Sequence, residues 1–172
     1  AFVRSGTNWT EQAKLTAPDP GSFDGFGLSV ALDGDTAMIG APAVDTPAGA
    51  DAGSAYAFVR SGTTWTVQAH LVVSGGAAGD GSGTSVAVRG NTAMIGAPAV
   101  DIPAGADAGS AYVFIRSGTL WTQQAELIAP DGAAGDAFGT SVALAEGTAV
   151  AGGPGDDILA KEDVGSAYVL WR

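Results

Sequence analysis

Short stretches of alternating hydrophobic and polar residues run along the chain, and residues typical of turns separate them. Between residues 26 and 71 there are four such stretches, and we expect strands at 26–32, 36–41, 53–60 and 65–71. The last stretch alternates clearly, so we expect its inward face to carry Trp65, Val67, Ala69 and Leu71. Asp33-Gly34-Asp35 has the composition of a tight hairpin turn between the first two strands. The pattern predicts an all-β chain of antiparallel strands.

The four-strand unit recurs every 56 residues, as the positions of Arg4, Arg60, Arg116 and Arg172 show. Trp9, Trp65 and Trp121 keep the same spacing, and residues 37–71 and 93–127 are nearly identical. Repeated four-stranded units that each meet an identical neighbour are typical of β-propeller blades. We therefore treat residues 1–172 as one propeller segment. Its units are 16–71, 72–127 and 128–172, and residues 1–15 supply strands that complete a terminal blade.

Two glycine motifs recur inside the units. Phe26-Gly27 is followed by Gly40-Ala41-Pro42, and Phe138-Gly139 by Gly152-Gly153-Pro154. The middle unit has Ser82-Gly83 but keeps Gly96-Ala97-Pro98, and Gly-Ser-Ala-Tyr occurs at 53–56, 109–112 and 165–168. On these motifs the whole chain resembles the FG-GAP repeats, the propeller blades of integrin α-subunit heads.

The resemblance implies a propeller, seven-bladed in integrins, and adhesion, lectin or enzyme-accessory roles in other relatives. Integrin-like blades hold calcium on an Asp-x-Asp-x-Asp-Gly loop between the first two strands. This chain has a two-residue turn at that place, so the usual calcium site of the family is not expected here.

Charge and composition narrow the possible partners. The chain has 18 acidic and 7 basic residues, so its surface repels nucleic acids and anionic lipids, and neither is an expected partner. No apolar run is long enough for membrane insertion, and there is no cysteine to form a disulfide. Asp outnumbers Glu, which suits high salt or a calcium-rich exterior. We expect an extracellular or cell-surface location.

Catalysis is not expected, because three nearly equal units offer every group three times rather than one asymmetric site. The only histidine, His70, aligns with Lys14 and Glu126, so we expect it to face solvent without a catalytic or metal-binding role. A carboxylate pair that cleaves glycosides is the remaining enzymatic hypothesis.

Three aspartate positions are retained in all three units, nine residues in total, and the loops that carry them should lie on one face. Two hypotheses stay open for them. They supply hard oxygen ligands to a calcium ion in each blade, or they cap turns by accepting backbone N–H bonds. The residues are Asp24, Asp45, Asp51, Asp80, Asp101, Asp107, Asp136, Asp157 and Asp163.

The repeated arginines and tryptophans have simpler interpretations. The arginines close the third strand at the opposite face, where we expect them to pair with nearby carboxylates or carbonyls. The tryptophans could stack on sugars if exposed, but we expect them to pack between blades.

Three units are fewer than the roughly 4–8 blades of known propellers. We therefore expect two copies to form a six-bladed homodimer, in which residues 9–15 of each copy supply the outer strand that the last unit lacks. The leading functional hypothesis is a non-catalytic binding or adhesion module. It would use its acidic loop-rich face to bind a protein or a carbohydrate. The alternative is a purely structural repeat array, either part of a larger surface protein or an engineered or amplified propeller.

Overall fold

The structure is a computed structural model that describes residues 1–159 and 161–171, and in them every regular element is a β-strand. No helix capable of crossing a membrane occurs in these two ranges. Blade 1 contains β3 (Ser29–Asp33), β4 (Thr36–Ala41), β5 (Ser54–Ser61) and β6 (Thr64–Leu71). Blade 2 contains β7 (Ser85–Arg89), β8 (Thr92–Ala97), β9 (Ser110–Ser117) and β10 (Leu120–Leu127). Blade 3 contains β11 (Ser141–Ala145), β12 (Thr148–Gly153) and β13 (Ser166–Trp171). A separate hairpin joins β1 (Phe2–Ser5) to β2 (Asn8–Glu11).

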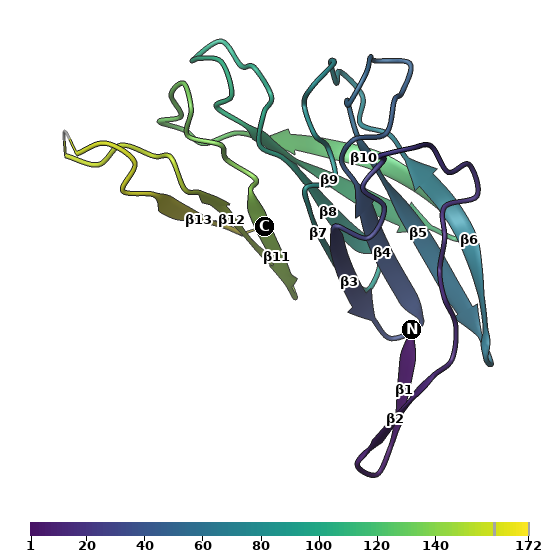
Figure 1. The fold of residues 1–172 in the computed structure, drawn as a ribbon. Helices are drawn as coiled ribbons and strands as arrows, with labels where there is room; N and C mark the ends of the chain where they lie inside the picture. The colour runs from purple at the N-terminus through teal and green to yellow at the C-terminus, as the bar shows by residue number, and fades with distance from the viewer. Residues whose placement is uncertain (160, 172) are drawn as a thin grey trace.

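The three blades stand side by side, with β3 next to β7 and β7 next to β11, and the β1–β2 hairpin projects away from them (Figure 1). Antiparallel pairing of neighbouring strands within each blade confirms the all-β class, and the four-stranded sheets are consistent with propeller blades. One predicted boundary is wrong, because β3 begins at Ser29 rather than at Phe26. Gly27 has a φ of 94°, which takes the backbone out of the β region before the strand starts.

The expected alternation along the outer strand is interrupted by a β-bulge at Gln68. Val67 lies opposite Phe58, whereas Ala69 lies opposite Ala57, so Gln68 is an extra residue in β6. Since consecutive residues of β5 point to opposite faces, the bulge moves the rest of β6 to the other face. The prediction that Trp65 and Leu71 share one face is therefore wrong.

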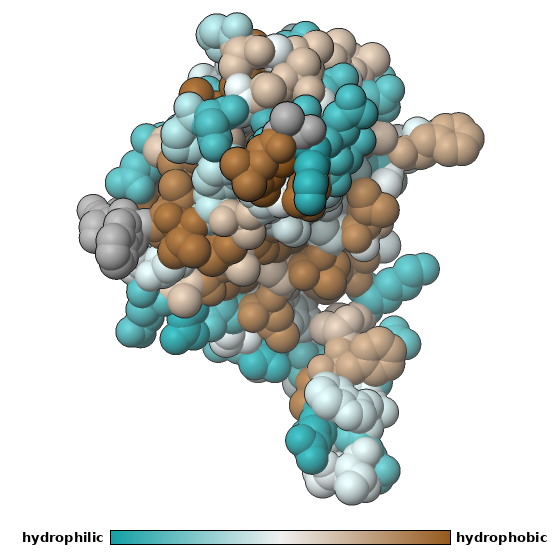
Figure 2. All heavy atoms as spheres, turned by 90° about the vertical axis from the view of Figure 1, so that its left-hand side faces the viewer, coloured by the Kyte–Doolittle hydropathy of each residue, from teal (hydrophilic) through white to brown (hydrophobic). Residues whose placement is uncertain are grey.

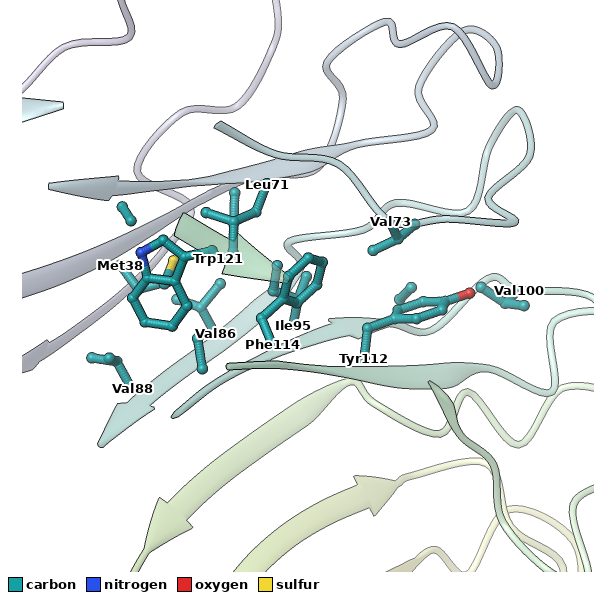
Figure 3. Packing of buried hydrophobic residues seen from close by; sticks show 14 residues of the cluster. Met38, Leu71, Val73, Val86, Val88, Ile95, Val100, Tyr112, Phe114 and Trp121 are labelled. Carbon is teal, nitrogen blue, oxygen red and sulfur yellow. The ribbon is translucent and has the colours of Figure 1, made fainter. Parts of the chain in front are cut away.

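The core lies mostly between blades rather than within one. Between blades 1 and 2 it includes Met38, Leu71, Val86 and Ile95, with Trp121 closing one side (Figure 3). A second cluster around Met94 and Phe138 joins blades 2 and 3. Each internal blade is thus stabilised by its neighbours, as expected for a repeat architecture.

The glycine motifs allow the backbones of neighbouring blades to approach each other closely. A Cβ atom on Gly40 would overlap the carbonyl oxygen of Gly83, and one on Gly96 would overlap that of Gly139. The Ser29 hydroxyl donates a hydrogen bond to the same Gly83 oxygen at 2.7 Å. Any side chain at Gly40 or Gly96 would therefore force adjacent blades apart.

The arginines lie where the third strand ends, on the side of the blades that carries the hairpin turns. Arg60 forms an ion pair with Asp35 at 2.6 Å and lies over the Trp65 ring. Arg116 donates to the Gly90 carbonyl at 3.0 Å and lies over the Trp121 ring. These contacts confirm the expected pairing for Arg60 and Arg116, while Arg172 lies outside the described residues.

At the N-terminus Arg4 also follows this expectation, because its Nε donates to the Gly6 carbonyl at 2.7 Å.

The two-residue turn between β3 and β4 is confirmed, because Asp33 pairs with Thr36 across it. Asp33 itself accepts hydrogen bonds from the Gly90 N–H and, with a smaller effect, from Arg89, which hold the pKa of its carboxyl below the usual value. Asp33, the last residue of β3 before the turn, therefore binds Arg89 of the next blade.

Candidate functional site: the loop face

The side of the blades opposite the hairpin turns is built from long loops, and we call it the loop face. It contains the lead-in loops before β3, β7 and β11 and the loops β4–β5, β8–β9 and β12–β13 (Figure 1). The β4–β5 and β8–β9 loops each bond to the lead-in loop of the next blade. Gly79 donates to the Ala50 carbonyl and Gly135 to the Ala106 carbonyl, both at 2.9 Å. The two loop types therefore lie together, as the sequence predicted.

The lead-in aspartates close tight turns. Asp80 accepts the N–H of Ala77 at 2.6 Å, and Asp136 accepts that of Ala133 at 2.6 Å. Asp24 accepts the N–H of Gly21 in the same way. Asp80 and Asp136 are only 4% and 3% exposed, and burial raises the pKa of Asp80 above its usual value. These three carboxylates are occupied by their own loops.

The other six aspartates form pairs across the second type of loop. Asp45, Asp101 and Asp157 accept the N–H of the aspartate six residues later, at 3.0, 3.0 and 2.8 Å. The later residue of each pair has a left-handed backbone, with φ between 51° and 52°. Its side chain is exposed, which leaves its carboxylate oxygens facing solvent. These residues are Asp51, Asp107 and Asp163.

The hypothesis of calcium binding requires several oxygen ligands around one ion. Across residues 1–159 and 161–171, no three Asp, Glu, His or Cys side chains are grouped so as to hold a metal. Six of the nine aspartates instead accept backbone N–H bonds, which supports the turn-capping hypothesis. Calcium binding at this face stays a prediction.

A tyrosine network that the sequence did not reveal lies below these loops. Tyr56 donates its hydroxyl to Asp19 at 3.0 Å, and Tyr168 donates to Asp131 at 2.7 Å. In blade 2 the aspartate is replaced by Gly75, and Tyr112 donates to Glu126 at 3.3 Å instead. Each blade thus keeps an acidic acceptor for its tyrosine, from the lead-in loop or from the outer strand, and Tyr168 has a second one in Asp156 at 3.0 Å.

Burial is the main reason that the pKa of each tyrosine lies above its usual value. It raises the pKa of Tyr56 to about 12, with a further contribution from Asp19. Burial also raises the pKa of Tyr168 to about 12, and that of Tyr112 rises for the same reason, helped by Glu126. The protein thus favours the neutral hydroxyl of each tyrosine, the form that donates to a carboxylate.

His70 occupies the position of Glu126 in blade 1. Its ring stacks on Tyr56 at a centroid distance of 4.2 Å, and Nε2 lies 2.8 Å from the Ser54 hydroxyl. Asp19 is 3.8 Å from Nδ1. Burial lowers the pKa of His70, although Asp19 opposes the shift. The side chain is 31% exposed. The expectation that it simply faces solvent is thus only partly right, because one face of the ring is packed.

A cavity of about 360 Å³ opens on the loop face of blade 2. Its walls are the lead-in loop, with Gly75 and Asp80, and the β8–β9 loop, with Val100, Asp101 and Asp107. Carboxylates and backbone groups of small residues dominate this lining. Such a surface accepts hydrogen bonds from hydroxyl, ammonium or guanidinium groups.

The repeated sequence motifs have a counterpart among known families. The FG-GAP repeat matches at residues 9–58, 65–114 and 121–170. The chain belongs to the FG-GAP repeat family. A search of the curated proteins found no match.

The FG-GAP matches at 65–114 and 121–170 begin in the outer strand of one blade, β6 or β10, and continue through the three inner strands of the next. The match at 9–58 begins in β2 of the hairpin and continues through β3, β4 and β5. The phenylalanines of the FG-GAP motif pack against the tyrosines that lie below the loop face. Phe26 and Phe138 pack edge-on against Tyr56 and Tyr168, at centroid distances of 5.5 and 5.4 Å. In blade 2 the FG-GAP phenylalanine is replaced by Ser82, whose buried hydroxyl has no hydrogen-bond partner within the described part of the chain.

The three repeated tryptophans differ in how far neighbouring residues bury them. Trp121 is 8% exposed and belongs to the core between blades 1 and 2, which confirms the packing interpretation there. Trp65 packs against a third core cluster, which includes Ile39 and Phe58 of blade 1. Trp9 is 65% exposed, so the packing prediction is wrong for it in the single chain. The reason is physical, because among the residues that the structure describes no blade lies next to the β1–β2 hairpin to cover the Trp9 ring.

Proposed function

We propose that this FG-GAP chain is a non-catalytic binding or adhesion module that acts through its loop face, outside the cell or at the cell surface. The observation that carries the proposal is the repeated display of Asp51, Asp107 and Asp163. Each follows the same Asp-capped turn, has the same left-handed backbone and is exposed. Successive blades thereby present the same carboxylate in the same setting, which suits an extended ligand.

The chemistry of the face limits the ligand. The net charge is −11, so anionic polymers are repelled. Fixed carboxylates and backbone carbonyls bind partners that donate hydrogen bonds. A hydroxyl-rich carbohydrate or a basic protein segment meets that requirement, and the cavity beside Asp101 and Asp107 is the place where one residue of such a ligand would enter.

The test is a binding screen with glycan arrays and immobilised basic peptides, repeated with a matched pair of variants. Asp51→Asn, Asp107→Asn and Asp163→Asn together remove the exposed charges, and asparagine tolerates the left-handed backbone. Glu146→Gln on the turn side is the control, because it removes a carboxylate away from the loop face. The Glu146 side chain is 90% exposed and makes only a long contact with Arg89, at 3.8 Å. Loss of binding in the triple variant alone supports the proposal. Equal loss in the control contradicts it.

A second candidate is a purely structural array. It is favoured by the bonds between loops of adjacent blades, such as Gly81 N–H to the Asp51 carbonyl at 3.2 Å. In that case the loops serve blade packing and have no ligand. Absence of binding to every glycan and peptide, with an intact fold, would favour this candidate. Turnover of a polysaccharide would favour an enzyme instead.

A further inference from the structure

Phe23, in the lead-in loop of blade 1, is an exposed aromatic residue with an unfavourable backbone conformation. It is 95% exposed, and its φ of 70° lies in the left-handed region, which is costly for a residue with a Cβ atom. At that exposure the ring has almost no contact with the described part of the chain that could offset the cost. The loop end, at the top of Figure 2, carries mainly hydrophilic and weakly hydrophobic residues. Neither packing nor backbone preference therefore explains this phenylalanine.

The equivalent residues in the next two units are Gly79 and Gly135, each with a φ of 86°. Both donate their N–H to a loop of the preceding blade at 2.9 Å, and both are nevertheless exposed. A Cβ atom on either glycine would meet, apart from its chain neighbours, no described atom within 4 Å. A side chain at this position thus points into solvent even where a blade lies on that side. The exposure of Phe23 is a property of the position in the repeat.

This position borders an opening between two loops. In blade 2, Gly79 lines the cavity of about 360 Å³ together with Asp101 and Asp107. That volume is at the lower end of the roughly 300–1,000 Å³ found for small-ligand sites. The equivalents of these three residues in blade 1 are Phe23, Asp45 and Asp51. The repeat thus places an aromatic ring at an opening where blade 2 has none.

The walls of this opening have the same backbone in blades 1 and 2. The lead-in turn is closed in both by the same capping bond to an aspartate, which is Asp24 in blade 1. In the other wall Asp45 accepts the N–H of Asp51 at 3.0 Å, the same distance as in blade 2. A bond of 3.1 Å from the Ala43 N–H to the Asp24 carbonyl joins the two walls. The Phe23 ring and the Asp51 carboxylate therefore border one opening.

We propose that this opening in blade 1 binds one pyranose residue of a carbohydrate. The proposal rests on the proposed function and selects the carbohydrate from its two classes of ligand. The apolar face of the pyranose lies on the Phe23 ring, and hydroxyl groups at its rim donate to the Asp51 carboxylate. A pyranose needs this combination, because it has an apolar C–H face surrounded by hydrogen-bond donors.

A basic peptide meets the requirements of this opening less well. An exposed phenylalanine gives a cation only a weak contact, and tryptophan is the ring that cations prefer. Two carboxylates of the same loops, Asp24 and Asp45, cap turns, and Asp19 accepts a tyrosine hydroxyl. Asp51 remains for direct contact with a ligand. One carboxylate is enough to accept two neighbouring sugar hydroxyls.

Blades 2 and 3 present the carboxylates of Asp107 and Asp163 but have glycine in place of the ring. Phe23 therefore provides the apolar contact for the ligand, and the other two blades contribute polar contacts only. Removal of this single ring should weaken carbohydrate binding although all the loop aspartates are kept.

The experiment uses the full chain and an array of neutral oligosaccharides of glucose, galactose, mannose and N-acetylglucosamine. Isothermal titration calorimetry then gives the affinity for the oligosaccharides that bind. Phe23→Gly should lower this affinity by about tenfold or more, because it removes the stacking surface. The melting temperature should stay the same or rise, since glycine adopts the left-handed backbone without strain. Phe23→Trp should keep most of the affinity, because it keeps an aromatic face.

Leu120→Ala is the matched control, because it removes a side chain of an apolar residue that is 67% exposed on the turn side. It should bind the oligosaccharide as the unmodified chain does. Equal affinity of Phe23→Gly and the unmodified chain would overturn the proposal, and so would an equal loss in Leu120→Ala.

The same array with immobilised basic peptides separates this proposal from the proposed function. Binding of basic peptides without binding of any neutral oligosaccharide overturns the pyranose site and leaves the proposed function intact. Oligosaccharide binding that is lost in the triple aspartate variant but kept in Phe23→Gly has the same meaning. Absence of binding to both kinds of probe contradicts both proposals.

Discussion

Trp121 donates its indole N–H to the side-chain oxygen of Gln68 in the preceding blade, at a distance of 2.9 Å. Gln68 is the bulged residue of β6, and the bulge leaves its side chain free of the alternation that governs its neighbours. The glutamine that breaks the strand pattern in one blade is thus the residue that binds the tryptophan of the next.

Gln68→Ala should destabilise the fold by about 1–3 kcal/mol, because the indole N–H of Trp121 would be buried without an acceptor. The free energy of unfolding from denaturant titration measures this. Thr122→Ala, an exposed substitution next to Trp121, is the control and should have little effect. A loss no larger than in the control would mean that water replaces the glutamine.

Trp121→Ala should cost about 3–5 kcal/mol, the usual range for truncating a buried tryptophan. Leu120 is its neighbour in β10 and is 67% exposed, so Leu120→Ala provides a matched control. Thermal and denaturant unfolding should separate the two variants clearly. If Trp121→Ala abolished sugar binding with unchanged stability, the packing assignment would be wrong.

The blades could be predicted because the 56-residue period is visible in arginines and tryptophans, whose spacing needs no knowledge of pairing. The bulge could not, since Gln68 is ordinary in a strand and becomes an extra residue only when β5 pairs with β6. Trp9 has a local sequence similar to that of Trp121, but burial depends on a neighbouring blade that local sequence does not describe.

The tyrosine network was missed for a related reason. Tyr56 and Asp19 are 37 residues apart and meet only because the lead-in loop folds back over the blade. In blade 2 the acceptor moves to Glu126, so no acidic position is shared by all three networks. A paired change in the sequence could have revealed the network. Where the other two units have Asp19 and Asp131, the middle unit has Gly75, and where earlier repeats have Lys14 and His70 it has Glu126.

Calcium should leave the melting temperature unchanged if the loop aspartates act as turn caps, as their N–H bonds indicate. Differential scanning fluorimetry with calcium and with a chelator measures this. A calcium-dependent rise would indicate a ligand that binds the folded state. Asp45→Asn combined with Asp51→Asn should then blunt the rise, which would assign the site to these loops.

Stability should fall as pH drops below 6.5, the ordinary pKa of histidine. His70 has a lowered pKa in the folded chain, so between that value and 6.5 the unfolded chain binds more protons. The stabilisation is present above 6.5 and is lost as pH falls through this window. Because His70 is the only histidine, His70→Gln should remove this part of the pH dependence. An unchanged profile in the variant would mean that His70 does not contribute to the pH dependence, since the raised pKa of Asp80 acts in the opposite direction.

Ser82→Ala should leave the free energy of unfolding unchanged or raise it by up to about 1 kcal/mol, because a buried hydroxyl without a partner is already costly. Ser82 is fully buried at the position where the other blades have Phe26 and Phe138, and its Oγ accepts or donates no hydrogen bond within the described residues. Ser110→Ala is the matched control. Its hydroxyl is equally buried but donates to Glu126 at 2.8 Å, so its removal should destabilise the chain. Denaturant unfolding of both variants gives the comparison. A larger loss for Ser82→Ala than for Ser110→Ala would mean that the Ser82 hydroxyl has a partner such as a buried water.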